Sequence, residues 1–164
     1  MWKAIADIEF LGDKDHLIIR KDVVKIFRTF EQKSSKTEAG GILLGFVYPG
    51  FTEICEATIP GKLDRFGQFF FIRSKNGAQR KINKAWIKSE GSLIYLGEWH
   101  THPDINPKPS ITDIDMIKKQ LKETEMEIDF LYLIIVGRDD TYWVAKQKNK
   151  KITILDRIQK IGID

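Results

Sequence analysis

The stretch from Gly97 to Asp113 constrains the fold more than any other part of the chain. It reads Gly-Glu-Trp-His-Thr-His-Pro-Asp-Ile-Asn-Pro-Lys-Pro-Ser-Ile-Thr-Asp. His100 and His102 are two residues apart, so an extended strand would place both imidazoles on one face. Three prolines follow, Pro103, Pro107 and Pro109. Because proline cannot continue a central strand, the chain must leave the sheet there as a constrained loop.

A helix is predicted directly after this loop. Ser110 suits the N-cap position, and Asp113 follows three residues later, in the spacing of a capping box with Asp in place of Glu. The helix dipole favours a carboxylate in this first turn. Four apolar residues then recur on one helical face: Ile111, Ile114, Ile117 and Leu121. The stretch therefore predicts a strand, a loop and an amphipathic helix.

These residues also form a candidate metal site. Two imidazoles and one carboxylate, from His100, His102 and Asp113, are a ligand set typical of a catalytic zinc that keeps a fourth position open for water. A structural zinc site would need four protein ligands, commonly cysteines, and the chain has one cysteine, Cys55. We therefore predict one Zn²⁺ per chain. Ser110 and Asp113 could alternatively serve only as helix caps, although capping would also fix the rotamers that a ligand site needs.

The motif resembles the JAMM motif of the MPN-plus zinc metalloproteases. The matching residues are His100-Thr-His102-Pro103 and, after six intervening residues, Ser110-x-x-Asp113. The resemblance implies a catalytic glutamate before a glycine-containing apolar strand, and Glu38 precedes the run Gly40-Gly-Ile-Leu-Leu-Gly-Phe-Val. It also implies that the Ser110 hydroxyl stabilises an oxyanion. The alternative for Glu38 is an exposed residue at the end of a polar loop.

The expected fold class is α/β, a mixed central β-sheet flanked by two to three helices, as in the MPN/JAMM and cytidine-deaminase-like folds that the resemblance implies. The nearly continuous apolar run Gly41–Tyr48 predicts a buried central strand. Helices are predicted over Lys21–Glu31 and Asn76–Lys88, the second with Ile82, Ala85 and Trp86 on its core face. At 164 residues the whole chain, 1–164, is expected to be one domain.

Composition limits the cellular location and the kinds of ligand that we expect. The net charge of +4 is spread along the chain without an aromatic-basic pattern, so nucleic-acid binding is not expected. A single cysteine excludes an intramolecular disulfide and suits a reducing, cytoplasmic location. Charges at Lys3, Asp7 and Glu9 argue against a signal peptide, and no apolar run is long enough to span a membrane. Cys55, in mid-strand, is expected to be a small buried apolar residue rather than a catalytic thiol.

The resemblance also implies a function. Members cleave an isopeptide or peptide bond after the C-terminal tail of a ubiquitin-like protein, and a sheet edge near Lys62–Ile72 could bind that tail by strand addition. The short connection Glu123–Asp129 leaves no room for the insertion that selects a second ubiquitin in eukaryotic deubiquitinases. The chain looks most like bacterial stand-alone JAMM proteins, notably those of CBASS antiphage systems, which release a conjugated CD-NTase-type cyclase.

The sequence leaves open two alternative functions and the role of Glu98. A non-catalytic MPN scaffold or binding module is one alternative function, and a RadC-like protein is another. Glu98 shares the strand face of the histidines, so it is either a support for the metal site or a surface residue at a strand edge. Trp99 and Thr101 point to the opposite face and are expected to pack there.

Overall fold

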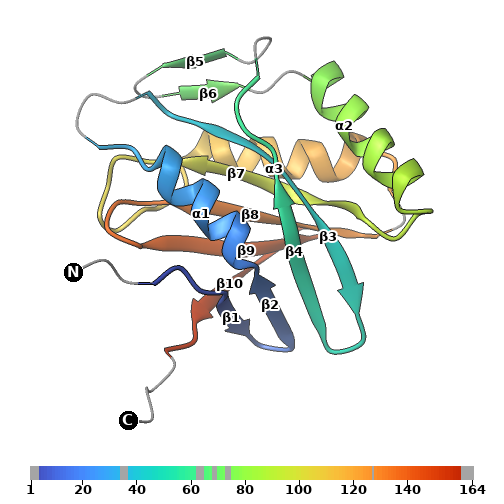
Figure 1. Cartoon of the computed structure of the whole chain (residues 1–164), viewed down its shortest axis with the longest axis horizontal. Helices are drawn as coiled ribbons and strands as arrows, with labels where there is room; N and C mark the ends of the chain where they lie inside the picture. Colours follow the sequence, from blue (N-terminus) through green and yellow to red (C-terminus); the bar gives the residue numbers. More distant parts are fainter. Residues whose placement is uncertain are drawn as a thin grey trace.

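Eight strands form one closed, mixed β-barrel in the order β1-β10-β9-β8-β7-β3-β4-β2 (Figure 1). This computed structural model describes residues 4–33, 37–61, 65–67, 70–72, 75–126 and 128–159. The barrel strands are β1 (Ile8–Gly12), β2 (Asp15–Ile19), β3 (Gly40–Tyr48), β4 (Phe51–Ala57), β7 (Ile94–Thr101), β8 (Phe130–Val136), β9 (Tyr142–Lys148) and β10 (Lys151–Arg157). The helices are α1 (Lys21–Phe30), α2 (Lys75–Lys88) and α3 (Ile111–Glu123).

The barrel corrects the predicted fold class, because the sheet is closed and is not an open central sheet flanked by helices. The closure depends on the short hairpin of β1 and β2. β2 pairs in parallel with β4, and β1 pairs antiparallel with β10, so the hairpin joins the two edges that an open sheet would leave. Periodicity predicts strands but not their partners, and for this reason the sequence did not reveal the closure.

A separate two-stranded sheet consists of β5 (Arg65–Gly67) and β6 (Phe70–Ile72). Sequence analysis expected a polar loop through residues 62–68, so the strand β5 within it was missed. The sheet edge suggested for tail binding, Lys62–Ile72, lies partly outside the described residues.

The barrel strands bury apolar side chains on both faces. The inner cluster joins α1 to the barrel through Val23, Val24 and Phe27, and the ring of Phe27 packs against Trp99 of β7. The outer cluster lies beneath α2 and α3 and includes Ile42, Leu44, Tyr95, Ile117 and Leu133. Burial on both faces explains the apolar residues of β3 up to Gly45. The predicted burial of the run Gly41–Tyr48 is wrong at its end, where Val47 and Tyr48 are exposed.

Two predicted core positions are wrong. Trp86 is 39% exposed, and Ile111, in the first turn of α3, is 82% exposed. The helices themselves agree with prediction, since Ala85 of α2 and Ile117 of α3 are buried against the sheet. No helix in the described part of the chain combines the length and apolar character needed to cross a membrane.

Candidate metal centre

A β-bulge in β7 determines which way the histidines point. Leu43 pairs with Gly97 and Leu44 with Tyr95, which leaves Leu96 as an extra residue in β7. The alternation of side chains is therefore reset, and Leu96 and Trp99 both face the inner cluster. Residues that alternate with Trp99 face outward, toward α3, and His100 is one of them.

Gly97 makes the bulge possible. A Cβ atom at this position would lie 1.9 Å from the carbonyl oxygen of Tyr132 on the neighbouring strand β8, and the φ angle is 150°. Any side chain would therefore push β7 away from β8 and shift the register of the strand that carries His100.

The three predicted metal ligands converge at the end of β7 and the start of α3. His100 Nε2 lies 3.0 Å from Asp113 Oδ1, and His102 Nε2 lies 3.2 Å from Asp113 Oδ2. One ligand atom from each of the three residues lies within 4.8 Å of the other two. This spacing suits three ligands of one ion, since ligand–zinc distances are about 2.0–2.2 Å.

The helix start holds Asp113 in place. The Ser110 hydroxyl accepts a hydrogen bond from the Asp113 amide at 3.1 Å, and the Asp113 carboxylate accepts one from the Ser110 amide at 2.8 Å. This is the predicted capping box. The second carboxylate oxygen, Oδ1, remains available on the side of His100.

The chemistry of the donor set fits a metal ion. His100 Nε2 is fully buried and has no hydrogen-bond partner of acceptable geometry within the described residues, although the carboxylate of Asp113 is close. A buried polar atom without a partner is costly, and a metal ion would satisfy it. Burial alone would raise the pKa of Asp113, but the two imidazoles and the Ser110 amide lower it far below its usual range. The carboxylate is therefore ionised, as a ligand must be.

The pKa of His102 also reflects the negative charge of the Asp113 carboxylate. Burial lowers it, but the neighbouring Asp113 carboxylate and the nearby Glu38 and Asp104 raise it more, so that the net change is upward. A neutral imidazole is needed for metal binding, and an ion at this position would oppose the protonation that Asp113 favours.

Glu38 lies beside the ligand cluster. Its Oε1 is 3.9 Å from His102 Nε2, and the residue is buried. Burial raises the pKa of Glu38 to about 7, with a smaller lowering by His102 and a small further raising by Asp113. The alternative that Glu38 is an exposed loop residue is therefore wrong. A carboxyl group with this pKa can both accept and release a proton near neutral pH.

Thr101 fixes the segment that carries Glu38. The Ala39 amide donates to the Thr101 hydroxyl at 3.0 Å, and the Thr101 amide donates to the Ala39 carbonyl at 2.9 Å. Thr101 and Trp99 are buried on the inner face, which confirms the packing prediction. The hydrogen bond of the Thr101 hydroxyl was not predicted from the sequence. The position of Thr101 between the two histidines could have indicated such a role.

Glu98 is buried, so the alternative of a surface residue at a strand edge is wrong for it. The Tyr95 hydroxyl donates to Glu98 Oε1 at 2.5 Å, and both residues are on the outer face of β7. Tyr95 was missed in the sequence, because the bulge at Leu96 hides that it shares the face of Glu98 and His100.

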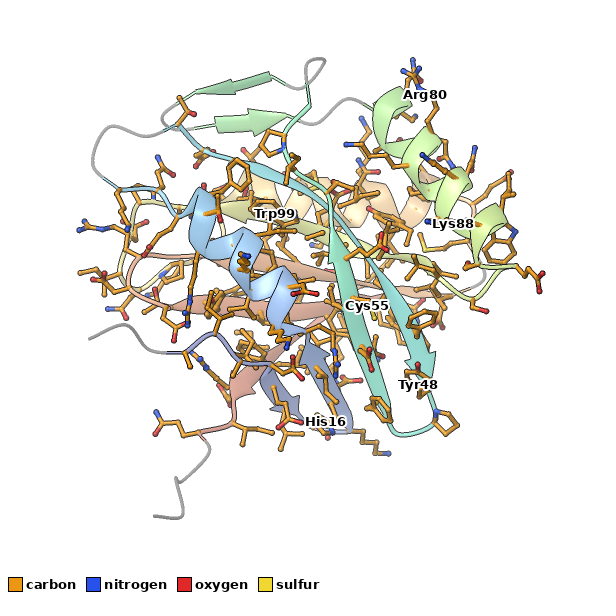
Figure 2. All side chains as sticks on the ribbon, viewed as in Figure 1. His16, Tyr48, Cys55, Arg80, Lys88 and Trp99 are labelled. Atoms are coloured by element: carbon orange, nitrogen blue, oxygen red, sulfur yellow. The ribbon has the colours of Figure 1, made fainter. Side chains whose placement is uncertain are left out.

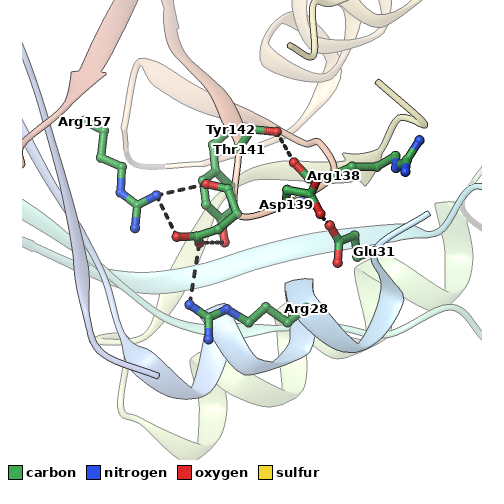
Figure 3. Close-up of polar contacts among 8 residues, drawn as sticks. Arg28, Glu31, Arg138, Asp139, Thr141, Tyr142 and Arg157 are labelled. Atoms are coloured by element: carbon green, nitrogen blue, oxygen red, sulfur yellow. Dashed lines mark hydrogen bonds and ion pairs between the residues drawn. The ribbon is translucent and has the colours of Figure 1, made fainter. Parts of the chain in front are cut away.

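The turn between β8 and β9 contacts both loops of the site, and Figure 3 shows its contact with Glu31. On one side the Arg138 amide donates to the Asp104 carbonyl at 2.9 Å, and Asp104 lies in the loop between His102 and Ser110. On the other side the Asp139 amide donates to the carboxylate of Glu31, which follows α1. Glu31 begins the segment that leads to Glu38, so one turn contacts the chain on both approaches to the site.

Two arginines hold this turn in its shape. Asp139 and Asp140 have left-handed φ angles of 57° and 60°, which are unfavourable for residues with a side chain. Arg157 Nη1 lies 3.1 Å from Asp140 Oδ2, and Arg28 Nη2 lies 3.6 Å from Asp140 Oδ1. Both arginines therefore contact the carboxylate of Asp140, one of the two turn residues with a left-handed backbone.

Cys55 does not compete with this site as a reactive group. It is half-buried on β4 (Figure 2), and burial together with the neighbouring Glu53 raises the pKa of its thiol to about 12. The thiol is therefore protonated at neutral pH, and a protonated thiol is a poor nucleophile.

Comparisons with known proteins identify the family of this chain. The family model described as "Prokaryotic homologs of the JAB domain" matches residues 20–148. A curated relative from Vibrio cholerae, named CD-NTase/cGAS isopeptidase, is 31% identical over 94% of this chain and 99% of its own length. Relatives of the same name from Escherichia coli and Pseudomonas aeruginosa are 33% and 40% identical, over 92% and 74% of this chain and 95% and 77% of their own.

A solved structure is similar in fold. The solution structure of a protein from Desulfitobacterium hafniense superposes with a TM-score of 0.54 and 17% identity, over 87% of this chain and 88% of that one. At this identity the likeness concerns the fold alone. The family match spans most of the chain and contains Glu38, His100, His102, Ser110 and Asp113. The chain therefore belongs to the family of prokaryotic homologs of the JAB domain.

Proposed function

We propose that this protein is a zinc-dependent isopeptidase that cleaves the bond after the C-terminal tail of a conjugated protein. The observation that carries the proposal is the convergence of His100, His102 and Asp113 with the buried Glu38 beside them. This is the set of groups needed for metal-assisted hydrolysis, namely three ligands and one group that handles protons.

In this proposal His100, His102 and Asp113 hold one zinc ion. A bound zinc ion supplies Lewis-acid chemistry to such a site. The capping box at Ser110 and the strand pairing of His100 with Gly40 fix the ligands before any substrate arrives. Rigid ligands hold the geometry that the reaction requires.

Glu38 is the proposed general base and acid. It takes a proton from the water that attacks the scissile carbonyl, and it then delivers that proton to the departing amine. The raised pKa of about 7 supports both steps, because the carboxyl group is then balanced between its two protonation states near neutral pH. Thr101 keeps the Glu38 segment next to the histidines.

Ser110 is the proposed donor to the oxyanion. Its hydroxyl oxygen already accepts the Asp113 amide, so the hydroxyl hydrogen is free to point outward and donate to the developing charge. Loss of one such donor typically lowers kcat by about 10²–10³-fold.

The proposed substrate is a protein conjugate whose flexible C-terminal tail is joined to a lysine or to another residue. The names of the relatives point to a CD-NTase-type cyclase as the conjugated protein. A folded segment could not bring its carbonyl to the site, so the tail must bind in extended form. Removal of such a conjugate would reverse a bacterial protein modification, in our proposal one of antiphage defence in the cytoplasm.

We propose that the protein has little selectivity for the group on the amine side of the scissile bond. α3 ends at Glu123 and β8 begins at Phe130, so the connection between them is short. It offers little surface to a second protein domain, and selectivity would therefore lie in the tail and the domain that precedes it.

The experiment uses a cyclase tail fused through its C-terminus to several unrelated proteins and, separately, to a lysine side chain. The zinc-loaded protein should cleave all of them at similar rates and should fail on a scrambled tail. The Glu38→Gln variant should bind zinc and the tail but lose nearly all turnover. Cleavage that depends on the leaving protein, with scrambled tails cut equally well, would contradict the proposal.

A further inference from the structure

Helix α2 carries an unbalanced positive charge. Its sequence, Lys-Asn-Gly-Ala-Gln-Arg-Lys-Ile-Asn-Lys-Ala-Trp-Ile-Lys, contains five cationic residues and no acidic one. All five are exposed, namely Lys75, Arg80, Lys81, Lys84 and Lys88. Figure 2 shows side chains that project from α2, among them Arg80 and Lys88. None of the five forms an ion pair within the described part of the chain, and like charges four residues apart destabilise a helix.

Three of these lysines border a groove between α2 and the strands β3 and β4. The groove has a volume of about 470 Å³ and is lined by Lys81, Lys84 and Lys88 on α2 and by Leu44, Phe46 and Leu93 on the barrel. We call it the α2 groove. It combines a row of positive charges with an apolar floor. Solvation of a charged helix face requires no apolar surface beside it, whereas a binding groove uses one.

We propose that the α2 groove binds an extended, acidic segment of a partner protein, in which carboxylates alternate with apolar side chains. Lys81 and Lys88, with Lys84 between them, are seven residues apart in the helix, or about 10 Å along its axis. Alternate side chains of an extended segment recur about every 6.6 Å, so two or three carboxylates can face this row. The intervening apolar side chains then point toward the floor at Leu44, Phe46 and Leu93.

The composition of the groove favours such a peptide over a nucleic acid. The phosphates of a nucleic acid could pair with the lysines, but they would make no favourable apolar contact with the side chains of Leu44 and Leu93. Glu56 of β4 also lines the groove and would repel a strand that carries charge on every side. A segment that directs its carboxylates toward α2 avoids this repulsion.

The test measures fluorescence anisotropy with a short fluorescein-labelled peptide of alternating glutamate and leucine. Three probes serve for comparison: a glutamine-leucine peptide, a glutamate-glycine peptide and a short oligothymidylate. The key variant is Lys81→Glu, Lys84→Glu, Lys88→Glu. Its matched control is Lys118→Glu, Lys119→Glu, Lys122→Glu on α3. Lys118 and Lys122 also border a hollow with apolar residues, so the control asks whether any lysine-lined hollow would suffice.

The α2 groove predicts that the glutamate-leucine peptide binds most tightly and that the α2 variant weakens its binding about tenfold or more, whereas the α3 variant changes it little. Phe46→Ser should weaken the binding of the glutamate-leucine peptide and should leave that of the glutamate-glycine peptide and the oligothymidylate unchanged. The single change Lys84→Gln provides a milder variant if the triple one does not fold, as checked by circular dichroism. Undetectable binding, equal losses in the two triple variants, or tighter binding of the glycine peptide or the oligothymidylate would overturn the proposal.

Discussion

Thr101 and Ala39 exchange two hydrogen bonds, one through their backbones and one through the Thr101 hydroxyl. Thr101 stands between the two histidines of the metal centre, and Ala39 follows Glu38. The distance between the proposed base and the proposed ligands thus depends on a residue whose side chain lies on the opposite face of β7 from His100.

Replacement of Thr101 by valine keeps the shape of the side chain and removes the hydroxyl acceptor. The buried Ala39 amide then lacks a partner, so the free energy of unfolding should fall by about 1–3 kcal/mol. We expect zinc content to stay unchanged and kcat to fall about tenfold, because Glu38 is no longer held in position. Thr52→Val, at another buried threonine, is the control: it should cost stability without lowering kcat. Equal kcat values for the two variants would contradict the role of Thr101.

The raised pKa of Glu38 predicts a pH-dependent stability of the zinc-free protein. The folded state holds the Glu38 proton up to about pH 7, whereas the unfolded chain releases it near its ordinary value of 4.5. The stabilisation is therefore greatest below pH 4.5 and is lost as the pH rises through 7. Between pH 5 and pH 8 the wild type should lose about 2 kcal/mol more of its unfolding free energy than Glu38→Gln. Urea denaturation at both pH values, in the presence of a chelator, would measure this difference, and parallel losses in the two proteins would refute it.

Ser110→Ala separates two roles of one hydroxyl. Loss of the helix cap should lower the unfolding free energy by about 1 kcal/mol. Loss of the oxyanion donor should lower kcat by about 10²-fold or more with a smaller change in KM. Ser89→Ala removes a comparable hydrogen bond, the one that Ser89 accepts from the Leu93 amide, and should affect stability alone. If Ser110→Ala is less stable but fully active, capping is its only role.

The contact between Glu31 and the β8–β9 turn predicts an effect on catalysis from outside the metal centre. Glu31→Ala removes the acceptor of the Asp139 amide and loosens the turn that also contacts Asp104. We expect zinc binding to persist and kcat to fall about threefold to tenfold, because both loops of the site lose support. Glu9→Ala, which removes the glutamate that pairs with His16, is the control and should leave kcat unchanged. An unchanged kcat in Glu31→Ala would show that the turn has no influence on the site.

The sequence predicted which residues come together at the candidate metal site better than it predicted the fold. His100, His102, Ser110 and Asp113 lie on one strand, one loop and one helix start, and local rules of alternation and capping were enough to bring them together. The position of Glu38 depends on pairing between β3 and β7, and the family resemblance supplied what local rules could not.

The closed barrel and the roles of Tyr95 and Thr101 depend on contacts between distant segments. The hairpin of β1 and β2 joins β4 to β10, two strands that are far apart in the sequence, and the residues of the hairpin do not indicate these partners. The bulge at Leu96 changes the face of every residue before it, so simple alternation assigns Tyr95 to the wrong side. Trp86 and Ile111 were misplaced because an apolar period shows a helical face but does not show where the sheet beneath it ends.

Zinc content measured by inductively coupled plasma mass spectrometry tests the central claim most directly. The purified wild type and Glu38→Gln should each hold about one zinc ion per chain, because Glu38 handles protons and is not a ligand. His102→Ala should lose the metal and all activity together, while circular dichroism shows that it remains folded. Full zinc occupancy in folded His102→Ala would contradict the assignment of His100, His102 and Asp113 as the metal ligands.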